Sequence, residues 1–525
     1  MVHSRPLLPV GHGEVLTSPD FSQWADLARD GHARAATWDF EIAGRPAREV
    51  RALARREAIE AGAEFSAKLG VPLTQKRDPE GLVVATGHQP DLYHPGIWIK
   101  DFLLQRLSDE SDAAAFDVVV DTDGFDSISV TSPCLAPGVT LCKQYLAVGT
   151  EDATFAGAAV PSSRDIDDFC SAADSMLASL PAPAIRRHFS AFCEDLRGAS
   201  QVAENLAELV TIARRRYEAS AGTDYLELPL TRLVSSAAFA LFVADIGHSA
   251  ARFRAAYNGE LADYRLVNKS RSASQPFPDL AAAGDRVELP LWSIVGGVRG
   301  GVWAQPAADG GVSFVTRDGA PLASIGAGED PVAALAASGV LFAPKALLLT
   351  LFVRLLCCDL FIHGVGGGRY DSVTDGVCRR YFGVELPAFV VASITMYLPL
   401  GAHVVTEQEV SEATERLNRL THNPDAVLGE VVFDSPQERE RALELAAEKT
   451  ELVRSILAPD ADKKALGMRI RTVNAGLGDM LAPLKAQMQT ELSALEAQRA
   501  ASRILTDRTY PFCLWSPEEI ADKVG

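Results

Sequence analysis

The chain has 525 residues, a formal net charge of −19 at pH 7, 47% apolar residues and 23% charged residues. This length exceeds the roughly 100 to 200 residues of an ordinary domain, so we expect a large core and at least one added module. Because the balance is acidic and no polybasic run occurs, nucleic acid and anionic membranes are not expected as partners.

The sequence also predicts where the protein resides. The amino terminus has only a short apolar patch broken by proline and glycine, so we expect no signal peptide. The most apolar window, residues 339–364, contains Lys345, Arg354 and Asp359, and is typical of a buried helix followed by a strand rather than a membrane span. The eight cysteines form no CxxC pair and no zinc-like spacing, which indicates reduced thiols and a cytoplasmic protein.

The first predicted segment, residues 1–75, is mainly helical after an irregular start, because residues 45–70 are rich in helix formers and end in glycine. The core is expected over residues 76–400. It begins with Leu82–Ala85, four apolar residues that suit a strand buried on both faces of a parallel sheet. Gly87 lets the backbone turn close to a ligand, and a helix follows. Open α/β sheets bind ligands outside the carboxyl ends of their strands. The polar side chains expected there are His88, Gln89 and His94.

Carboxylates follow the next predicted strand, Val118–Val120. They are Asp121, Asp123 and Asp126. Such groups can hold a substrate amine, bind a ribose hydroxyl, coordinate magnesium or act as a base, and the sequence leaves these alternatives open. An Asx-type turn that caps the strand is the structural alternative.

Two modules are expected to interrupt the core. Residues from about 162 to 260 have a helical pattern and should form an insertion packed on the sheet. Residues from about 287 to 325 are glycine-rich and β-like, which predicts hairpins that cover an opening. Trp292 and Trp303 of this cover could stack on a ligand ring, although core packing is the commoner role of tryptophan.

A second strand-loop-helix unit begins at Leu360–Ile362. Its helix should span about Ser372 to Phe382, and a further strand from Ala388 completes a βαβ pattern. Glycines of the loop could present backbone amides to an anion, and its arginine suits phosphate or carboxylate. A glycine-rich turn with a surface arginine is the alternative. The candidate residues are His363, Gly364, Gly366, Gly367, Gly368, Arg369, Tyr370 and Asp371.

Residues 401–505 are predicted to form a helical arm. Apolar residues between Leu466 and Leu495 recur every three or four positions, as in a coiled coil, and Pro483 should kink the helix or mark a boundary. Segments 415–420 and 440–457 would supply the antiparallel partner within the chain. The remaining apolar residues, Met480, Leu481 and Met488, favour a homodimer. The tail, residues 506–525, is too apolar for a free terminus, so we expect it to dock on the core.

These motifs together resemble the bacillithiol biosynthesis cysteine-adding enzyme family. The resemblance rests on TGHQPDLYHPG, DTDGFD, HGVGGGRYD with FGVELPAFVV, and the carboxyl-terminal arm. The family's loops typically read G-Q-Q-x-G-L, E-D-H-D-F and G-G-P-G-E. Here His88 replaces the first glutamine, the acidic pattern is shifted, and Arg369 with Tyr370 stands where a glutamate is expected.

The resemblance implies a small-molecule ligase that joins an amino acid such as cysteine to an amino-sugar conjugate or other small amine. The family's core is similar to that of class I aminoacyl-tRNA synthetases and nucleotidylyltransferases, and HPGI at His94–Ile97 matches half of their HxGH signature. An adenine nucleotide is therefore the candidate cofactor, and whether it activates the carboxylate stays open.

We therefore predict an α/β protein with a Rossmann-like parallel core, a helical insertion and an α-helical coiled-coil arm. The expected partners are a small-molecule substrate and a second copy of the chain, with no nucleic acid and no membrane. The alternative is a catalytically silent nucleotide- or metabolite-binding scaffold whose coiled coil recruits partners. No metal site is expected. The catalytic candidates are His88, His94, Asp121 and Asp123, and Gly87 and Gln89 join the second loop as binding candidates.

Overall fold

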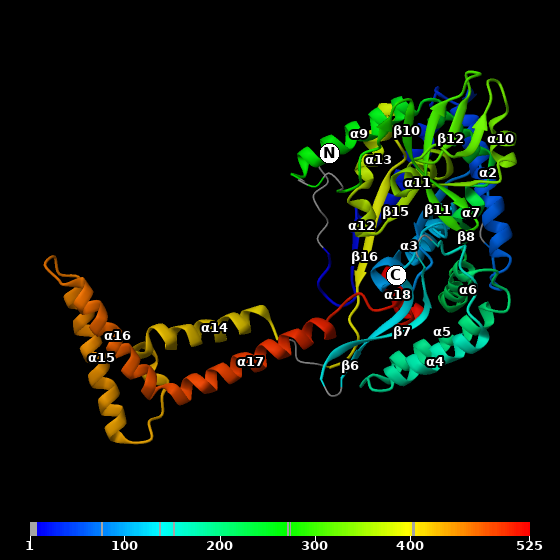
Figure 1. Ribbon diagram of the computed structural model, residues 1–525. Helices are drawn as coiled ribbons and strands as arrows, with labels where there is room; N and C mark the ends of the chain where they lie inside the picture. The colour runs from blue at the N-terminus through cyan, green and yellow to red at the C-terminus, as the bar shows by residue number, and fades with distance from the viewer. Residues whose placement is uncertain are drawn as a thin grey trace. The chain divides into compact units, whose positions relative to one another are not determined.

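The computed structural model describes residues 8–74, 77–135, 138–150, 153–269, 272, 275–401 and 405–525. The chain divides into two compact units. The first contains Met1–Ser132, Cys142–Leu398 and Arg508–Gly525, and the second contains Pro133–Leu141 and Pro399–Asp507. The first unit mixes helices with strands, which confirms the α/β class (Figure 1). Within the described ranges, none of the helices has the length and apolar character to cross a membrane.

The first unit is built on a six-stranded sheet with the order β1-β16-β15-β4-β5-β8. The strands are β1 (Glu14–Ser18), β4 (Val83–His88), β5 (Ala114–Val119), β8 (Leu226–Pro229), β15 (Leu360–His363) and β16 (Phe389–Thr395). The strands from β16 to β8 are parallel, and β1 pairs antiparallel with β16. The carboxyl ends of five strands therefore meet at one edge, which we call the carboxyl edge.

Two strands of this sheet differ from the sequence-based expectation. β1 lies in the segment predicted to be mainly helical, and it makes the sheet mixed rather than purely parallel. Most of its residues are half-buried, so it lacks the apolar run of a buried strand. β8 lies inside the predicted helical insertion. Its four residues are too few to carry a periodic signal between two long helices.

The two faces of the sheet are chemically different. Val83 and Ala85 of β4, with Phe116 and Val118 of β5, point into the main apolar core. This core also takes residues of α2 (Ala47–Ser66) and α8 (Ala237–His248). The opposite face carries polar side chains and is covered by α3 (Pro95–Ser111) and α6 (Leu206–Glu218). Because successive side chains of a strand point to opposite faces, one face of the sheet is apolar and the other is polar.

Further elements surround this sheet. The remaining helices of the first unit are α1 (Trp24–Ala35), α4 (Ser163–Leu177), α5 (Pro183–Ala199), α7 (Leu230–Leu233), α9 (Ala250–Val267), α10 (Pro331–Ala337), α11 (Ala346–Phe352), α12 (Val365–Gly368), α13 (Asp371–Tyr381) and α18 (Pro517–Val524). Two short strands, β2 (Glu41–Ile42) and β3 (Arg45–Pro46), pair with each other, as do β6 (Ser127–Cys134) and β7 (Thr140–Val148).

A second, antiparallel sheet corresponds to the predicted β-rich cover. Its order is β13-β12-β11-β10-β14, with β9 paired to β10. The strands are β9 (Ala282–Ala283), β10 (Arg286–Val295), β11 (Val298–Pro306), β12 (Val312–Val315), β13 (Pro321–Ile325) and β14 (Leu341–Pro344). The sheet extends beyond the predicted boundary, because β14 returns to pair with β10 after α10.

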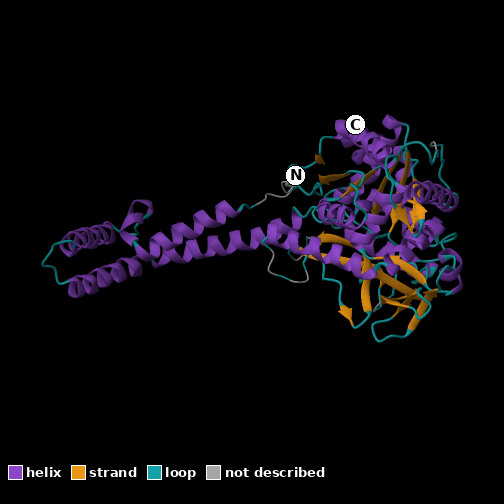
Figure 2. Cartoon of the chain, turned by 90° about the horizontal axis from the view of Figure 1, so that it is seen from above, coloured by secondary structure: helices purple, strands orange, loops and turns teal. Residues whose placement is uncertain are grey.

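The second unit contains four long helices, α14 (Glu407–His422), α15 (Pro436–Ile456), α16 (Lys463–Met480) and α17 (Ala482–Leu505) (Figure 2). α14 packs along α17, and α15 packs along α16. Pro483 lies in the first turn of α17, so it marks a boundary between two helices. Leu481 and Met488 are buried within this unit with Leu420 and Val427, so the expectation that they favour a second chain is wrong.

The tail packs on the first unit through its aromatic residues. The backbone N–H of Phe512 donates to the carbonyl oxygen of Tyr93 at 2.7 Å, and the Tyr217 hydroxyl donates to the carbonyl oxygen of Trp515 at 2.6 Å.

Six cysteines have free thiols, whereas Cys134 and Cys142 are disulfide-bonded. The expectation of eight reduced thiols is therefore wrong for this pair. Both residues lie on the paired strands β6 and β7, and strand pairing, which no CxxC spacing reveals, accounts for their approach.

Candidate functional site

The carboxyl edge brings together two of the predicted residues, Gln89 after β4 and Asp123 after β5. Gln89 Nε2 donates to Asp123 Oδ2 at 2.9 Å, and Arg299 Nη1 of β11 donates to Asp123 Oδ1 at 3.1 Å. The Asp123 side chain is 34% exposed, so its carboxylate remains accessible between its two donors. A cationic group from the second sheet thus completes a polar cluster that begins on the first.

Trp292 of β10 extends this cluster. The Arg299 guanidinium lies 4.9 Å from the centroid of the Trp292 ring, and Lys345 Nζ lies 4.3 Å from it. Both contacts are cation–π interactions. Lys345 Nζ is also 3.5 Å from Glu288 Oε1, and burial lowers the pKa of Lys345. We call Gln89, Asp123, Trp292, Arg299 and Lys345 the edge cluster.

The edge cluster requires a residue without a Cβ atom at position 124. A Cβ atom at this position would lie 2.5 Å from Arg299 Nη2. Any larger residue would therefore push the guanidinium away from Asp123. Residues 121–124, DTDG, therefore contain both the Asp123 carboxylate and the glycine that leaves room for Arg299.

His88 lies at the end of β4 beside the edge cluster and is half-buried. Its ring meets the Tyr93 ring edge-on at 5.0 Å, and its Nδ1 lies 3.2 Å from the Gln89 carbonyl oxygen. Burial, with the positive charge of Lys100, lowers the pKa of His88 to about 3, so the imidazole is neutral at neutral pH. The tautomer that donates from Nδ1 leaves Nε2 as an acceptor.

His94 and Asp121 make structural contacts. His94 caps α3, because its Nδ1 accepts from the backbone N–H of Gly96 at 3.0 Å. Asp121 is buried, and its two carboxylate oxygens accept from the backbone N–H and the hydroxyl of Thr231 at 2.9 and 2.5 Å. Burial raises the pKa of Asp121 to about 6. Asp121 therefore ties the end of β5 to the start of α7, and it does not share the contacts of Asp123.

The acidic segment does not assemble a metal centre. Asp126 is exposed, and Asp121 and Asp123 contact different partners. Across the described ranges, no three histidine, cysteine or acidic side chains are grouped so that they could hold a metal ion.

A row of polar residues crosses the sheet just below the carboxyl edge. Thr86 of β4 is the register partner of Asp117 on β5, and Asp117 is the register partner of Glu227 on β8. All three are buried. Because register partners point to the same face, they form a continuous polar strip facing α3 and α6.

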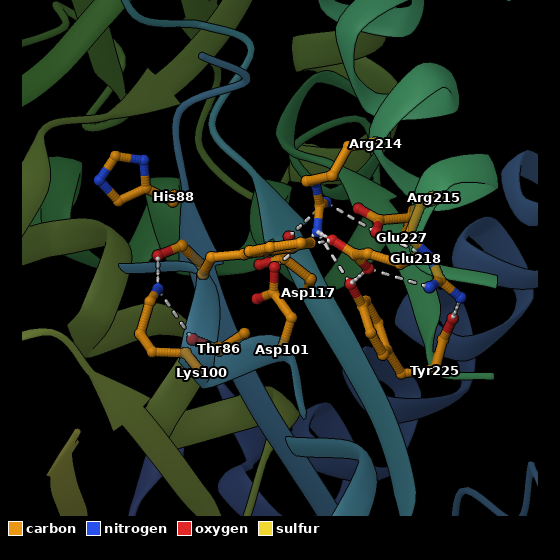
Figure 3. A network of polar contacts seen from close by, with 12 residues as sticks. Thr86, His88, Lys100, Asp101, Asp117, Arg214, Arg215, Glu218, Tyr225 and Glu227 are labelled. Carbon is orange, nitrogen blue, oxygen red and sulfur yellow. Dashed lines mark hydrogen bonds and ion pairs between the residues drawn. The ribbon is translucent and has the colours of Figure 1, made fainter. Parts of the chain in front are cut away.

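Arg214 of α6 collects the carboxylates of this strip (Figure 3). Its Nη2 donates to Asp117 at 3.0 Å and to Glu227 at 2.7 Å, while its Nη1 donates to Asp101 of α3 at 2.7 Å and to Glu218 at 3.2 Å. Arg215 and Tyr225 complete the network, since both bond to Glu218. The network joins two helices to two strands through charge-assisted hydrogen bonds.

The network contains more acidic than basic groups. Its carboxyls are Asp101, Asp117, Glu218 and Glu227, and its cations are Lys100, Arg214 and Arg215. Burial raises the pKa of Asp101 to about 8 and also raises the pKa of Glu227. Asp101 therefore holds a proton at neutral pH, which reduces the repulsion among the four carboxyls.

Lys100 connects this network to the loop that carries His88. Its Nζ donates to the Gly87 carbonyl oxygen at 2.9 Å and to the Thr86 hydroxyl at 3.1 Å, and its side chain is buried (Figure 3). Burial lowers the pKa of Lys100. Lys100 thus anchors the backbone immediately before His88 through the carbonyl oxygen of Gly87.

The glycines of the second predicted loop differ in the space around them. Gly364 caps the short helix α12, which contains the other three glycines. Gly367 and Gly368 pack closely, since a Cβ atom would lie 2.7 Å from His363 Nδ1 or 2.4 Å from Val391 Cγ2, respectively. Gly364 and Gly366 border open space, and Arg369 is exposed.

The residues that flank this loop have structural partners. His363 is buried, and its Nε2 lies 2.8 Å from Asp371 Oδ2. Asp371 also accepts from Arg354 Nη1 at 2.7 Å, and its pKa is lowered, chiefly by Arg354, against the effect of its burial. The Tyr370 ring packs edge-on against Phe277 at 5.7 Å. The two predicted loops leave adjacent strands, and each makes its own polar contacts.

Several residues of the site were not predicted from the sequence. They are Lys100, Asp101, Asp117, Arg214, Glu227, Arg299 and Lys345. A signal existed for some, because Asp117 and Glu227 are charged positions inside short apolar strands, and Lys100 and Asp101 interrupt an apolar helix. Comparison with protein-family models and with curated proteins finds no match to this chain.

Proposed function

We propose that the protein is a small-molecule enzyme of the ligase type, which condenses the carboxylate of an amino acid with an amine. By the resemblance of its motifs, the amino acid is cysteine and the amine belongs to an amino-sugar conjugate. The observation that carries the proposal is the accessible Asp123 carboxylate held between Gln89 and Arg299 at the carboxyl edge.

The edge cluster offers a complementary group for each end of such substrates. Asp123 can accept hydrogen bonds from an ammonium group, while Arg299 and Lys345 can bind a carboxylate. An amine attacks a carboxyl carbon only in its neutral form, so a proton must leave the ammonium group. That proton passes to solvent, because the lowered pKa of His88 makes its ring a weak base. The neutral ring can instead accept a hydrogen bond from the amine, and Lys100 positions the loop on which it lies.

For the candidate adenine nucleotide, the chain offers a partial fit. The open space beside Gly364 and Gly366 and the exposed Arg369 suit a phosphate group. When bound, a nucleotide would supply activation of the substrate carboxylate.

The test is a condensation assay. The protein is incubated with cysteine and glucosamine, with and without ATP and Mg²⁺, and mass spectrometry detects a product equal to the two substrates minus water. Asp123→Asn should lower kcat/KM by about 10- to 150-fold, because losing a charge-assisted hydrogen bond to the ammonium group costs about 1.5 to 3 kcal/mol. The matched control is Asp126→Asn, because Asp126 is exposed in the same acidic segment. Equal rates for the two variants would contradict the role of Asp123.

The second candidate is a metabolite-binding scaffold without turnover. It is favoured by the closely packed second loop, in which His363 and Asp371 are engaged in structural contacts. Native mass spectrometry of a ligand copurified with the protein separates the two functions. A ligand released unchanged after incubation with cysteine and ATP would favour the scaffold.

We propose that the parallel strands form a Rossmann-like core, that α14–α17 act as a coiled-coil arm, and that the protein is cytoplasmic. We further propose a homodimer, supported by three exposed apolar residues, Leu443 of α15, Leu457 immediately after α15, and Met468 of α16. Light scattering on the intact protein and on Leu457→Glu/Met468→Glu tests this. A monomeric intact protein would refute the dimer, and a dimeric variant would exclude this surface.

A further inference from the structure

A groove runs between α4 and α5 of the first unit, away from the edge cluster in sequence. Its volume is about 540 Å³. Three arginines line it, Arg186, Arg187 and Arg197, together with Asp174 and two cysteines, Cys170 and Cys193. Arg186 forms a two-bond ion pair with Asp174, and Arg197 pairs with Asp167.

The two cysteines line this groove from its two helices. Cys170 lies on α4 and Cys193 on α5, and each is only 3% exposed. Both thiols line the same groove from neighbouring packed helices, and each shifts the pKa of the other. A disulfide needs the two Cβ atoms to approach and point together, and the packing of α4 on α5 keeps these two positions on neighbouring helices at one groove.

Cys170 differs from the other free thiols. The hydrogen bond from Cys193 lowers the pKa of Cys170, and the charge of Arg197 acts in the same direction. The pKa of each of the five other free cysteines is raised. Because the thiolate is the nucleophile, Cys170 is the free thiol best prepared to react.

We propose that Cys170 and Cys193 form an oxidation site that a small hydroperoxide entering the arginine-lined groove converts into a disulfide between α4 and α5. The groove gives the oxidant access to thiols that are otherwise covered. The arginines stabilise the anionic sulfur and the departing oxygen.

The reaction proceeds in two steps. The Cys170 thiolate attacks one oxygen of hydrogen peroxide, the O–O bond breaks, and the released hydroxide takes a proton to leave as water. Cys170 is then a sulfenic acid. Cys193 sulfur attacks the Cys170 sulfur, the S–O bond breaks, and a second water leaves with the Cys193 proton. In total two thiols and one peroxide give one disulfide and two waters, so the thiols are oxidised and the peroxide is reduced.

The test is peptide mapping of the full chain. The protein is treated with hydrogen peroxide, remaining thiols are blocked with iodoacetamide, and trypsin is added without reductant. Cleavage after Arg164, Arg186, Arg187 and Arg197 places Cys170 in residues 165–186 and Cys193 in residues 188–197. We expect these two peptides to be linked, and dithiothreitol should separate them. Absence of the link, or a link from Cys193 to Cys513 instead, would overturn the proposal.

Two variants separate the reaction of this thiol pair from general oxidation of the chain. In Cys193→Ala, peroxide should leave a sulfenic acid on Cys170 that dimedone labels, whereas wild type should show little labelling. In Cys378→Ala, which changes a buried thiol outside the groove, the linked peptides should form as in wild type. Iodoacetamide should modify Cys170 at least about tenfold faster than Cys378 in the folded protein. Equal rates would show that the groove does not activate this thiol.

Discussion

Asp117 and Glu227 are register partners on neighbouring strands, and the same nitrogen of Arg214 donates to both, at 3.0 and 2.7 Å. Two like charges on adjacent strands would repel each other in a buried layer. The positive guanidinium of Arg214 offsets this repulsion, and its hydrogen bonds link β5, β8 and α6. The polar face of the sheet therefore depends on one side chain.

Replacing Arg214 should strongly destabilise the first unit. Arg214→Met leaves buried carboxylates without their counter-charge, and breaking a buried ion pair in this way typically lowers the free energy of unfolding by about 3 to 5 kcal/mol. Guanidinium chloride unfolding measures the change. Arg29→Met is the matched control, because Arg29 pairs with Asp26 on the exposed surface of α1 and should leave the midpoint nearly unchanged. Equal midpoints for the two variants would contradict the role of the network.

The protonated Asp101 predicts a pH dependence of stability. Its pKa rises from 3.8 to about 8 in the folded state, so between these values the folded state binds more protons than the unfolded state. The contribution of this group to the free energy of unfolding therefore falls as pH rises through that window. Asp101→Asn cannot ionise and should lose less stability than wild type from about pH 5 to pH 8. Chemical unfolding at both pH values measures the difference, and parallel losses would exclude a raised pKa.

The glycines of α12 should respond differently to alanine. In Gly367→Ala the new methyl group would lie 2.7 Å from the ring of His363, which Asp371 holds in place. We expect a loss of about 1 to 3 kcal/mol in the free energy of unfolding. Gly366→Ala faces open space on the same helix, so it should be neutral or stabilising by up to about 1 kcal/mol. If both variants unfold at the same denaturant concentration, the close packing against His363 is wrong.

Arg299 and Arg369 are the two candidate ligands for a bound anion. Isothermal titration with inorganic pyrophosphate compares Arg299→Ala of the edge cluster with Arg369→Ala of the second loop. Loss of a charge-assisted hydrogen bond weakens binding by about 1.5 to 3 kcal/mol. A weaker affinity in Arg299→Ala alone places the anion at the edge cluster, and a weaker affinity in Arg369→Ala alone supports the cradle predicted from the glycines. Unchanged affinity in both variants would reject both sites.

The elements whose pattern is local could be predicted from the sequence. The apolar run before His88 and the run before His363 both indicated buried parallel strands, and each is followed by a helix near the expected place. Pro483 indicated a boundary that lies between α16 and α17. Such signals depend only on periodicity and on backbone restrictions of single residues.

The partners of each side chain were decided by the tertiary structure. Asp121 and Asp123 stand two residues apart with the same chemistry, yet one is buried against Thr231 and the other meets Gln89 and Arg299. Arg299 lies 176 residues from Asp123 on a different sheet, and no local pattern connects them. Burial, charge pairing and pKa depend on which distant segments pack together. The sequence by itself therefore determined which strand ends were candidates for a site. Only the packing of distant segments determined which side chains at those strand ends lie together.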